Sequence, residues 1–375
     1  LPGSYTPKGI VDHIQMLGYA KLPGNKYLIN WPNCGNDYFL DWPNMTFEEV
    51  QKGISDAKQH TLNFVYYIQH ELGFKNLIVH NEFNTNDSFP WIPYHRESRR
   101  LKGLVQLTVN EVRNPYAYDL FKTGIAVGDY PIDHHHDKNP NAPKIDFIGI
   151  KVPSYNVPLG SLIPKETPNF IVAEKNISVS NIVNGATRLQ PVVLGIGQAA
   201  GALAALALNM DIHPKEVAVR DVQKALLAEQ VYLMPFIDVK PSDKAFYAIQ
   251  KIGATGILKG QGISYKWANQ TWFYPNAFLS RYELIEGLKK YYSIFSGLEG
   301  SGELVDFSFF KALLDSAKFT SEPIDESALI TMGLSQYISQ PQKPMTRSAL
   351  AIMLDVVLDP FSLAIDHHGK LIFSD

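Results

Sequence analysis

The sequence of 375 residues has a single cysteine, Cys34, so an intrachain disulfide cannot form. Such scarcity fits a reducing compartment and equally a secreted protein that avoids thiols, so cysteine usage does not fix the location. Residues 1–20 lack a basic region followed by an apolar core, and we expect no signal peptide in them. The pattern starts without Met or a first strand, so we expect a mature or trimmed piece of a longer protein.

An excess of charge of one sign is also missing. The chain has 34 basic and 37 acidic residues, a formal net charge of −3, which gives no attraction to nucleic acid or anionic membranes. The longest apolar stretch, 191–210, is interrupted by Gln198, and we predict no membrane span. Walker loops, zinc-ligand spacings and nucleophilic triads are absent from the sequence, so we predict no metal site.

What is present is the composition of a globular protein, with 45% hydrophobic and 19% charged residues and a length suited to two domains. Thr46 and Glu49 form a capping-box pattern that predicts a helix from there to Gly73. Strand-like runs at 76–80, 104–109 and 124–130 alternate with loops, and 169–180 is a further predicted strand. Pro191 is placed to begin a long helix that continues to about Asn209.

The glycine-rich run from Gly195 to Gly201 falls inside this predicted helix. A dinucleotide fingerprint needs its glycines in the turn between a strand and a helix, so the run is not that fingerprint. Small residues at 197, 201 and 204–205 would instead form a flat face for close packing. The simplest interpretation is a close-packed helix that binds no ligand.

The longer segment 168–208, PNFIVAEKNISVSNIVNGATRLQPVVLGIGQAAGALAALAL, resembles the C-terminal segment of FAD-dependent oxidoreductases of the glutathione-reductase-like superfamily. In that family the amino end of the helix points at the flavin. Its partial positive charge suits the anionic edge of the reduced ring. The resemblance implies flavin contacts by six residues: Gly185, Ala186, Thr187, Arg188, Gln190 and Pro191.

The resemblance extends over about residues 1–230, through blocks at 26–32, 35–37, 95–100 and 128–134. Some members are labelled xanthan lyases, for which this sequence offers no chemical reason. The chain departs from the family at Glu174-Lys175, where Gly-Arg is common, and it lacks the amino-terminal βαβ unit with GxGxxG. We therefore expect FAD binding by this chain alone to be incomplete.

Two groups of residues are candidates for substrate chemistry. Arg96, Arg99 and Arg100 could clamp a carboxylate or phosphate, or could pair with acids such as Glu97 and Glu111. By the resemblance, at least one arginine faces the flavin pocket, and Arg99 or Arg100 would orient the substrate.

The run Asp133–Asp137 contains three consecutive histidines. In a strand only His134 and His136 would face the same way, with Asp133 or Asp137 orienting one of them. A proton donor or a polar loop fits this pattern better than a metal site. We predict that His135 or His136 handles a proton in catalysis.

Residues 236–239, 245–260 and 274–283 resemble a surface-layer homology module, and 330–358 resemble a second copy. Ser280 and Thr346 are predicted N-caps of repeated helices, each followed by an arginine. The resemblance implies binding of cell-wall polysaccharide and a cell-envelope location, periplasmic or secreted. The alternative is a small helical domain that binds nothing.

We thus predict an α+β fold, the C-terminal portion of an FAD-dependent oxidoreductase over 1–233 with a mixed sheet, followed by a small all-α domain over 234–375. The predicted chemistry is hydride transfer between FAD and a small organic or sugar-related substrate. Two alternatives remain open: a non-catalytic carbohydrate-binding envelope protein on a flavoprotein scaffold, and a polysaccharide lyase.

Overall fold

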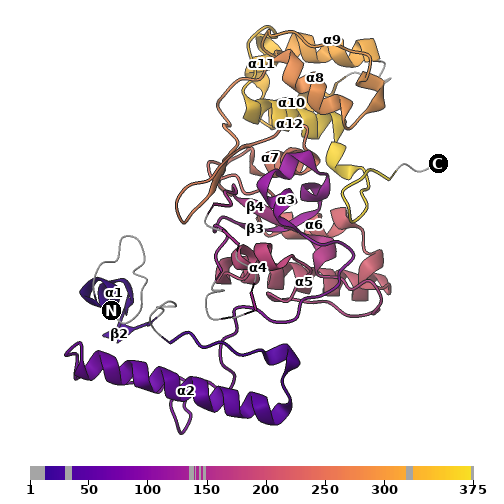
Figure 1. Cartoon of the computed structure of the whole chain (residues 1–375). Helices are drawn as coiled ribbons and strands as arrows, with labels where there is room; N and C mark the ends of the chain where they lie inside the picture. The colour runs from indigo at the N-terminus through magenta and orange to yellow at the C-terminus, as the bar shows by residue number, and fades with distance from the viewer. Residues whose placement is uncertain are drawn as a thin grey trace. The chain divides into compact units, whose positions relative to one another are not determined.

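The computed structural model describes residues 13–29, 36–134, 139, 141–142, 145–146, 149–317 and 324–372. The chain divides into two compact units. Unit 1 comprises Leu1–Arg99 and His134–Asp146, and unit 2 comprises Arg100–Asp133 and Phe147–Asp375. Helices predominate, and the sheets of the described residues are two-stranded and antiparallel (Figure 1). The prediction of an α+β fold is confirmed, but the predicted mixed sheet is wrong, because the sheets of the described residues are antiparallel pairs.

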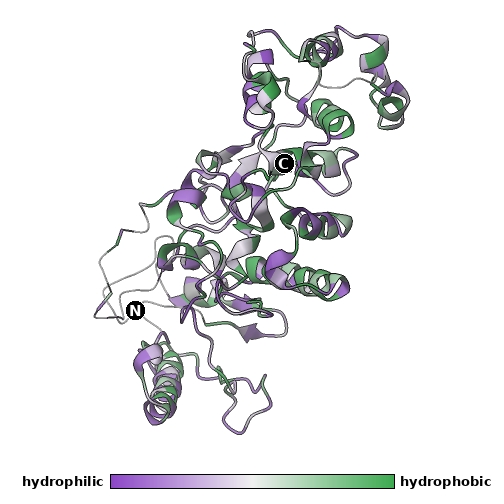
Figure 2. Ribbon diagram, turned by 90° about the vertical axis from the view of Figure 1, so that its right-hand side faces the viewer, coloured by the Kyte–Doolittle hydropathy of each residue, from purple (hydrophilic) through white to green (hydrophobic). Residues whose placement is uncertain are grey.

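Unit 1 contains the long helix α2 (Phe47–His70). Thr46 accepts a hydrogen bond from the Glu49 amide and the Glu49 carboxylate accepts one from the Thr46 amide, so the predicted capping box is confirmed. Figure 2 shows both hydrophilic and hydrophobic residues along α2, as expected of a helix with one packed face. Its Phe64 and Ile68 pack with Leu17 of α1 (His13–Tyr19). The remaining elements of the unit are β1 (Lys21–Leu22), β2 (Lys26–Tyr27) and the 3-10 helix η1 (Trp42–Asn44).

The first half of unit 2, up to residue 233, surrounds the antiparallel pair β3 (Gly124–Gly128) and β4 (Tyr155–Pro158). In this pair Gly128 lies opposite Tyr155. The long helix α5 (Gln190–Met210) packs on β3. An added Cβ at Gly195 would lie 3.1 Å from the Cβ of Ala126, so this glycine permits the close approach of helix and strand. The other elements are α3 (Val109–Arg113), η2 (Pro115–Ala117), η3 (Leu120–Thr123), η5 (Leu159–Ser161), α4 (Asn181–Thr187), η6 (Pro214–Glu216) and α6 (Val219–Ala228).

One side of α5 does not pack as predicted. Its buried residues include Val192, Ile196 and Leu203, whereas Gly201 has no atom within 4 Å of an added Cβ. Leu194 and Leu208 each lie seven positions from Gly201, on the same side of the helix, and they are 75% and 81% exposed. The small-residue face at Gly201 is therefore turned to the outside, and the expected close packing there is wrong.

Three predicted strands are also wrong. Residues 76–80, 104–109 and 169–180 form no regular strand. The last two are linked through the isolated bridge between Leu107 and Val179, and Val109 already begins α3. An alternating pattern identifies which face of a strand is apolar, but a ladder also requires a partner strand at the right position.

The second half of unit 2 is mainly helical, and Figure 2 shows hydrophobic stretches in its helices. Ser280 caps α8 through a capping box with Glu283, and Thr346 caps α12, so both predicted N-caps are confirmed. The helices are α7 (Phe246–Thr255), α8 (Arg281–Lys289), η7 (Ser293–Phe295), α9 (Phe307–Ala317), α10 (Glu326–Thr331), α11 (Ser335–Ser339), α12 (Arg347–Leu358) and η8 (Pro360–Ser362).

The prediction that this half is all-α is wrong. It contains the hairpin of β5 (Gln261–Ile263) and β6 (Gln270–Trp272). Gly262 gives the hairpin its position: an added Cβ there would lie 2.5 Å from the Cβ of Pro153. Thr271 accepts a hydrogen bond of 2.7 Å from the Ser154 hydroxyl. The hairpin is thus stabilised by residues 153–154 of the first half, which are distant in the sequence.

The predicted boundary at 233/234 lies inside one continuous hydrophobic core of unit 2, which extends from Val105 to Ile365. The Asn156 amide donates a 3.0 Å hydrogen bond to the Leu233 carbonyl. Buried Arg220 donates to the Tyr291 hydroxyl at 3.1 Å, and its guanidinium carbon lies 4.3 Å from the centre of the Phe361 ring. The two halves are therefore joined by buried contacts.

Candidate functional site

A buried ion pair precedes the long helix of unit 2. Arg188 is the C-cap of α4, and its Nη2 lies 3.1 Å from a carboxylate oxygen of Asp133 and 3.3 Å from the Asp133 carbonyl. The Arg188 side chain is 7% exposed and that of Asp133 is 28% exposed. Because a buried guanidinium is costly unless paired, this pair fixes the turn between α4 and α5.

The amino end of α5 follows this turn. Leu189 is its N-cap and provides no side-chain hydrogen bond, and Pro191 occupies the first turn. Gln190 and Pro191 are exposed. First-turn amides that no side chain caps, together with the helix dipole, form a local positive site. The residues here fit the anionic edge of a flavin, since no acidic residue occupies the first turn.

The other residues predicted to contact the cofactor are covered. Gly185, Ala186 and Thr187 are buried in α4, which Ser180 caps. The Thr187 hydroxyl donates to the Val183 carbonyl at 3.3 Å. The structure thus brings all six predicted residues into one continuous stretch, in which only Gln190 and Pro191 are exposed to a ligand.

The histidine run is described only in part. His134 belongs to unit 1, its side chain is fully buried, and its Nδ1 lies 3.0 Å from a carboxylate oxygen of Glu97. Asp133, one of the two acids predicted to orient a histidine, pairs with Arg188, and Asp137 lies outside the described residues. His135 and His136 lie outside the described residues.

The arginine cluster is divided between the units. Arg96 pairs with Asp37, and Arg99 donates to the Pro43 carbonyl at 2.7 Å, all within unit 1. Arg99 is exposed, and Arg100 is half-buried and belongs to unit 2. Sequence reasoning did not find Asp37 as the partner of Arg96, and it named Glu97 as a partner of the arginines rather than of His134; Asp37 lies in one of the blocks that carry the family resemblance.

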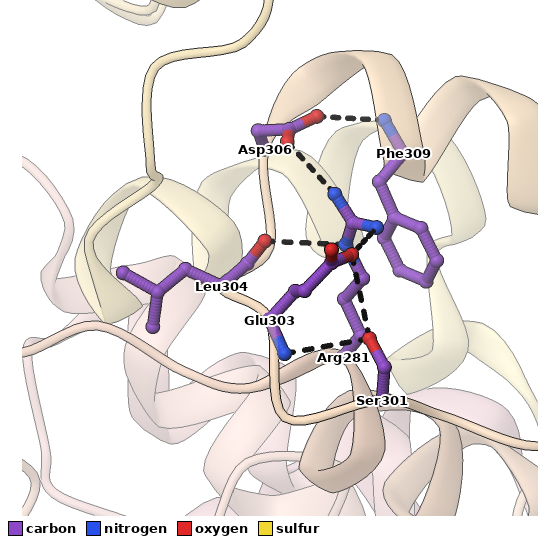
Figure 3. A network of polar contacts seen from close by, with 6 residues as sticks. All are labelled: Arg281, Ser301, Glu303, Leu304, Asp306 and Phe309. Atoms are coloured by element: carbon purple, nitrogen blue, oxygen red, sulfur yellow. Dashed lines mark hydrogen bonds and ion pairs between the residues drawn. The ribbon is translucent and has the colours of Figure 1, made fainter.

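The arginines at the starts of the repeated helices are bound by protein groups. Arg281 pairs with Glu303 and with Asp306 at 3.1 Å and stacks over Phe309 (Figure 3). Arg347 donates to the carbonyls of Phe273 and Lys259 at 2.8 and 2.6 Å. Both guanidinium groups therefore stabilise the helical half of unit 2.

The described residues also bear on metal binding and on membrane crossing. No group of three or more His, Cys, Asp or Glu side chains that could hold a metal occurs among the described residues. By length and composition α5 could cross a membrane, with a third of its most apolar window buried. Its six buried residues belong to the core of unit 2, which accounts for much of that hydropathy.

Comparison with known proteins supports the resemblance carried by these blocks. The FAD dependent oxidoreductase family matches residues 3–226, more than half of the 375 residues. Neither a curated protein nor a solved structure shows significant similarity to the chain. The match ends before the helical half of unit 2, and no comparison supports the likeness of that half to surface-layer homology modules. Over the matched region, the chain belongs to the family of FAD-dependent oxidoreductases.

Proposed function

We propose that this chain supplies the flavin-proximal part of an oxidoreductase that transfers a hydride between FAD and a small organic, sugar-related substrate. The observation that carries the proposal is the amino end of α5, which no side chain caps and which the Arg188–Asp133 pair precedes. FAD, when bound, accepts or donates the hydride. The chain's own amides at Gln190 and beyond would hold the anionic edge of the ring.

The substrate side of the proposal rests on the family pattern. Arg99 or Arg100 would orient a substrate carboxylate, for which a forked guanidinium is suited. His135 or His136 would hold and move a proton at the substrate.

A second segment would complete the FAD site. The family's GxGxxG unit is not found in these 375 residues, and it contributes the contacts to the ADP half of the cofactor. Leu194 and Leu208 expose an apolar face on α5, and Phe170 is 52% exposed. Exposed apolar surface of this kind is typical of a docking face, so we propose that the ADP-binding segment covers α5.

A pair of variants tests the site at α5. Leu189→Asp and Leu189→Asn would both cap the helix, but only aspartate places a negative charge at the proposed flavin edge. We expect FAD affinity, measured by quenching of flavin fluorescence with the ADP-binding segment supplied, to be about tenfold weaker for the aspartate variant than for the asparagine variant. Equal affinities would contradict the placement of the flavin at this helix end. A colourless protein that takes up no FAD under these conditions would refute the oxidoreductase function itself.

The non-catalytic alternative, binding of cell-wall polysaccharide in an envelope location, is tested by retention on purified polysaccharide against an inert protein. Arg281 and Arg347 are already bound by protein groups, so these two arginines do not favour this alternative over hydride transfer. Polysaccharide lyase activity predicts release of unsaturated uronates that absorb ultraviolet light, and we expect none.

A further inference from the structure

A cleft of about 560 Å³ lies in unit 2, away from every residue predicted to contact the flavin. One wall is formed by Arg113–Ala117, at the end of α3 and in η2, and another by residues 151–156. The third wall comes from the second half of the unit, through Met234, Pro235 and the β5–β6 hairpin. This volume is within the range of small-molecule sites in proteins.

The walls are held by buried hydrogen bonds. The Asn156 amide donates to the carbonyls of Phe121 and Leu233, at 2.8 and 3.0 Å. The Ser154 hydroxyl binds Thr271 of the hairpin at 2.7 Å. These bonds connect residues 151–156 to Phe121 and to the third wall, so this side of the cleft is formed before a ligand binds, which lowers the entropic cost of binding.

The charges around the cleft have one sign. Among the residues that the structure describes, Arg113 and Lys151 are the only charged ones that line it, and no carboxylate does. Both side chains are exposed at the rim, and Arg113 has no ion-pair partner in the part of the chain that the structure describes. Asn114, Ser264 and Thr271 add neutral hydrogen-bonding groups. An anion with several hydroxyl groups matches this set.

Exposed aromatic rings continue the hairpin beyond the cleft. Tyr265 directly follows Ser264, which lines the cleft, and is 48% exposed. Trp267 is 67% exposed and stacks on Tyr130 with ring centres 5.9 Å apart. Large rings held by stacking offer flat apolar faces to the C–H side of a sugar ring.

We propose that this cleft binds a carboxylate-bearing sugar of the hexuronate type. Arg113 takes the carboxylate, Asn114 and Ser264 take the hydroxyls, and the aromatic rings that follow Ser264 in the hairpin loop take the apolar face of a pyranose. The site is a binding site independent of the proposed flavin chemistry, and each can fail without the other.

The test is calorimetric titration of the full chain with D-glucuronate, methyl glucoside and acetate. We expect glucuronate to bind most tightly, because the neutral sugar lacks the charge and acetate lacks the ring. Binding of glucuronate should weaken with added salt. Equal affinity for glucuronate and acetate would overturn the assignment of a sugar as the ligand. Equal affinity for glucuronate and methyl glucoside would overturn the proposed binding of the carboxylate by Arg113.

Three variants locate the site. Arg113→Gln should weaken glucuronate binding by up to about fivefold, as expected for one exposed ion pair. Trp267→Ala should weaken it about two- to tenfold through the lost ring face. Lys224→Gln, at an exposed lysine of α6 outside the cleft, is the matched control and should change nothing. All three side chains are exposed, so melting curves should confirm that the variants fold. Unchanged affinity in both Arg113→Gln and Trp267→Ala would refute the proposal.

Discussion

The ion pair between Asp133 and Arg188 gives the most direct test of how the turn between α4 and α5 is held. In Asp133→Asn the side-chain oxygen can still accept a hydrogen bond from Arg188, but the buried guanidinium loses its counter-charge. Breaking a fully buried pair costs about 3–5 kcal/mol. Since the Asp133 side chain keeps 28% exposure, we expect a smaller loss, about 2 kcal/mol of the free energy of unfolding.

Urea unfolding measures this loss. With a slope of about 3 kcal/mol per molar urea, a loss of about 2 kcal/mol lowers the midpoint by somewhat under 1 M without changing the slope. Glu286→Gln is the control, because Glu286 pairs with Lys289 on the surface of α8 at 40% exposure. Removing such a pair costs less than about 0.5 kcal/mol. If the two variants unfold at the same urea concentration, the buried pair does not stabilise the turn.

Three further predictions concern stability. An added Cβ at Gly287 would lie 2.3 Å from the Ile257 carbonyl oxygen, so Gly287→Ala should cost about 3 kcal/mol in urea unfolding, whereas Gly297→Ala, with open space around it, should cost under 1 kcal/mol. Burial lowers the pKa of His367 below its usual value of 6.5, so the neutral form is favoured in the folded state; the associated stability is present above pH 6.5 and is lost as pH falls through the lowered pKa. Calorimetric melting from pH 7 to 5 should therefore show a flatter dependence on pH for His367→Asn than for the natural chain, and parallel curves would contradict this. Ser280→Ala should cost about 1 kcal/mol through the lost N-cap of α8, measured by urea unfolding, and an unchanged midpoint would show that the capping box is dispensable.

Local signals in the sequence predicted the helices well. The Thr46 and Ser280 caps act over three residues, and Pro191 lies within the first turn of α5, so neighbouring residues alone determine these helix starts. The failed strand at 169–180 depends instead on what lies beside it. The hairpin of β5 and β6 was missed for the same reason, since its position depends on Pro153 and Ser154.

The candidate site shows the same division. Arg188 was recognised from the family pattern around it, but its partner Asp133 is 55 residues away in the chain. His134 and Glu97 are 37 residues apart. A run such as DHHHD shows that titratable groups are close in sequence, whereas the fold decides which of them meets a distant charge. The cleft in unit 2 corresponds to no sequence motif, because its lining residues come from four separate segments.

The hydrogen bonds of Asn156 also constrain the order in which the chain can fold during synthesis. Its amide needs the Leu233 carbonyl, and its neighbour Ser154 needs Thr271, so the β4 region has buried polar groups that stay unpaired until residue 271 has left the ribosome. Domains usually fold in order from the amino terminus as they emerge. Here the core around β3 and β4 must wait for more than a hundred further residues, and during that interval its apolar surface is exposed to other nascent chains. We therefore expect a chain that stalls just after residue 226, where the family match ends, to be a substrate for chaperones rather than a folded oxidoreductase fragment.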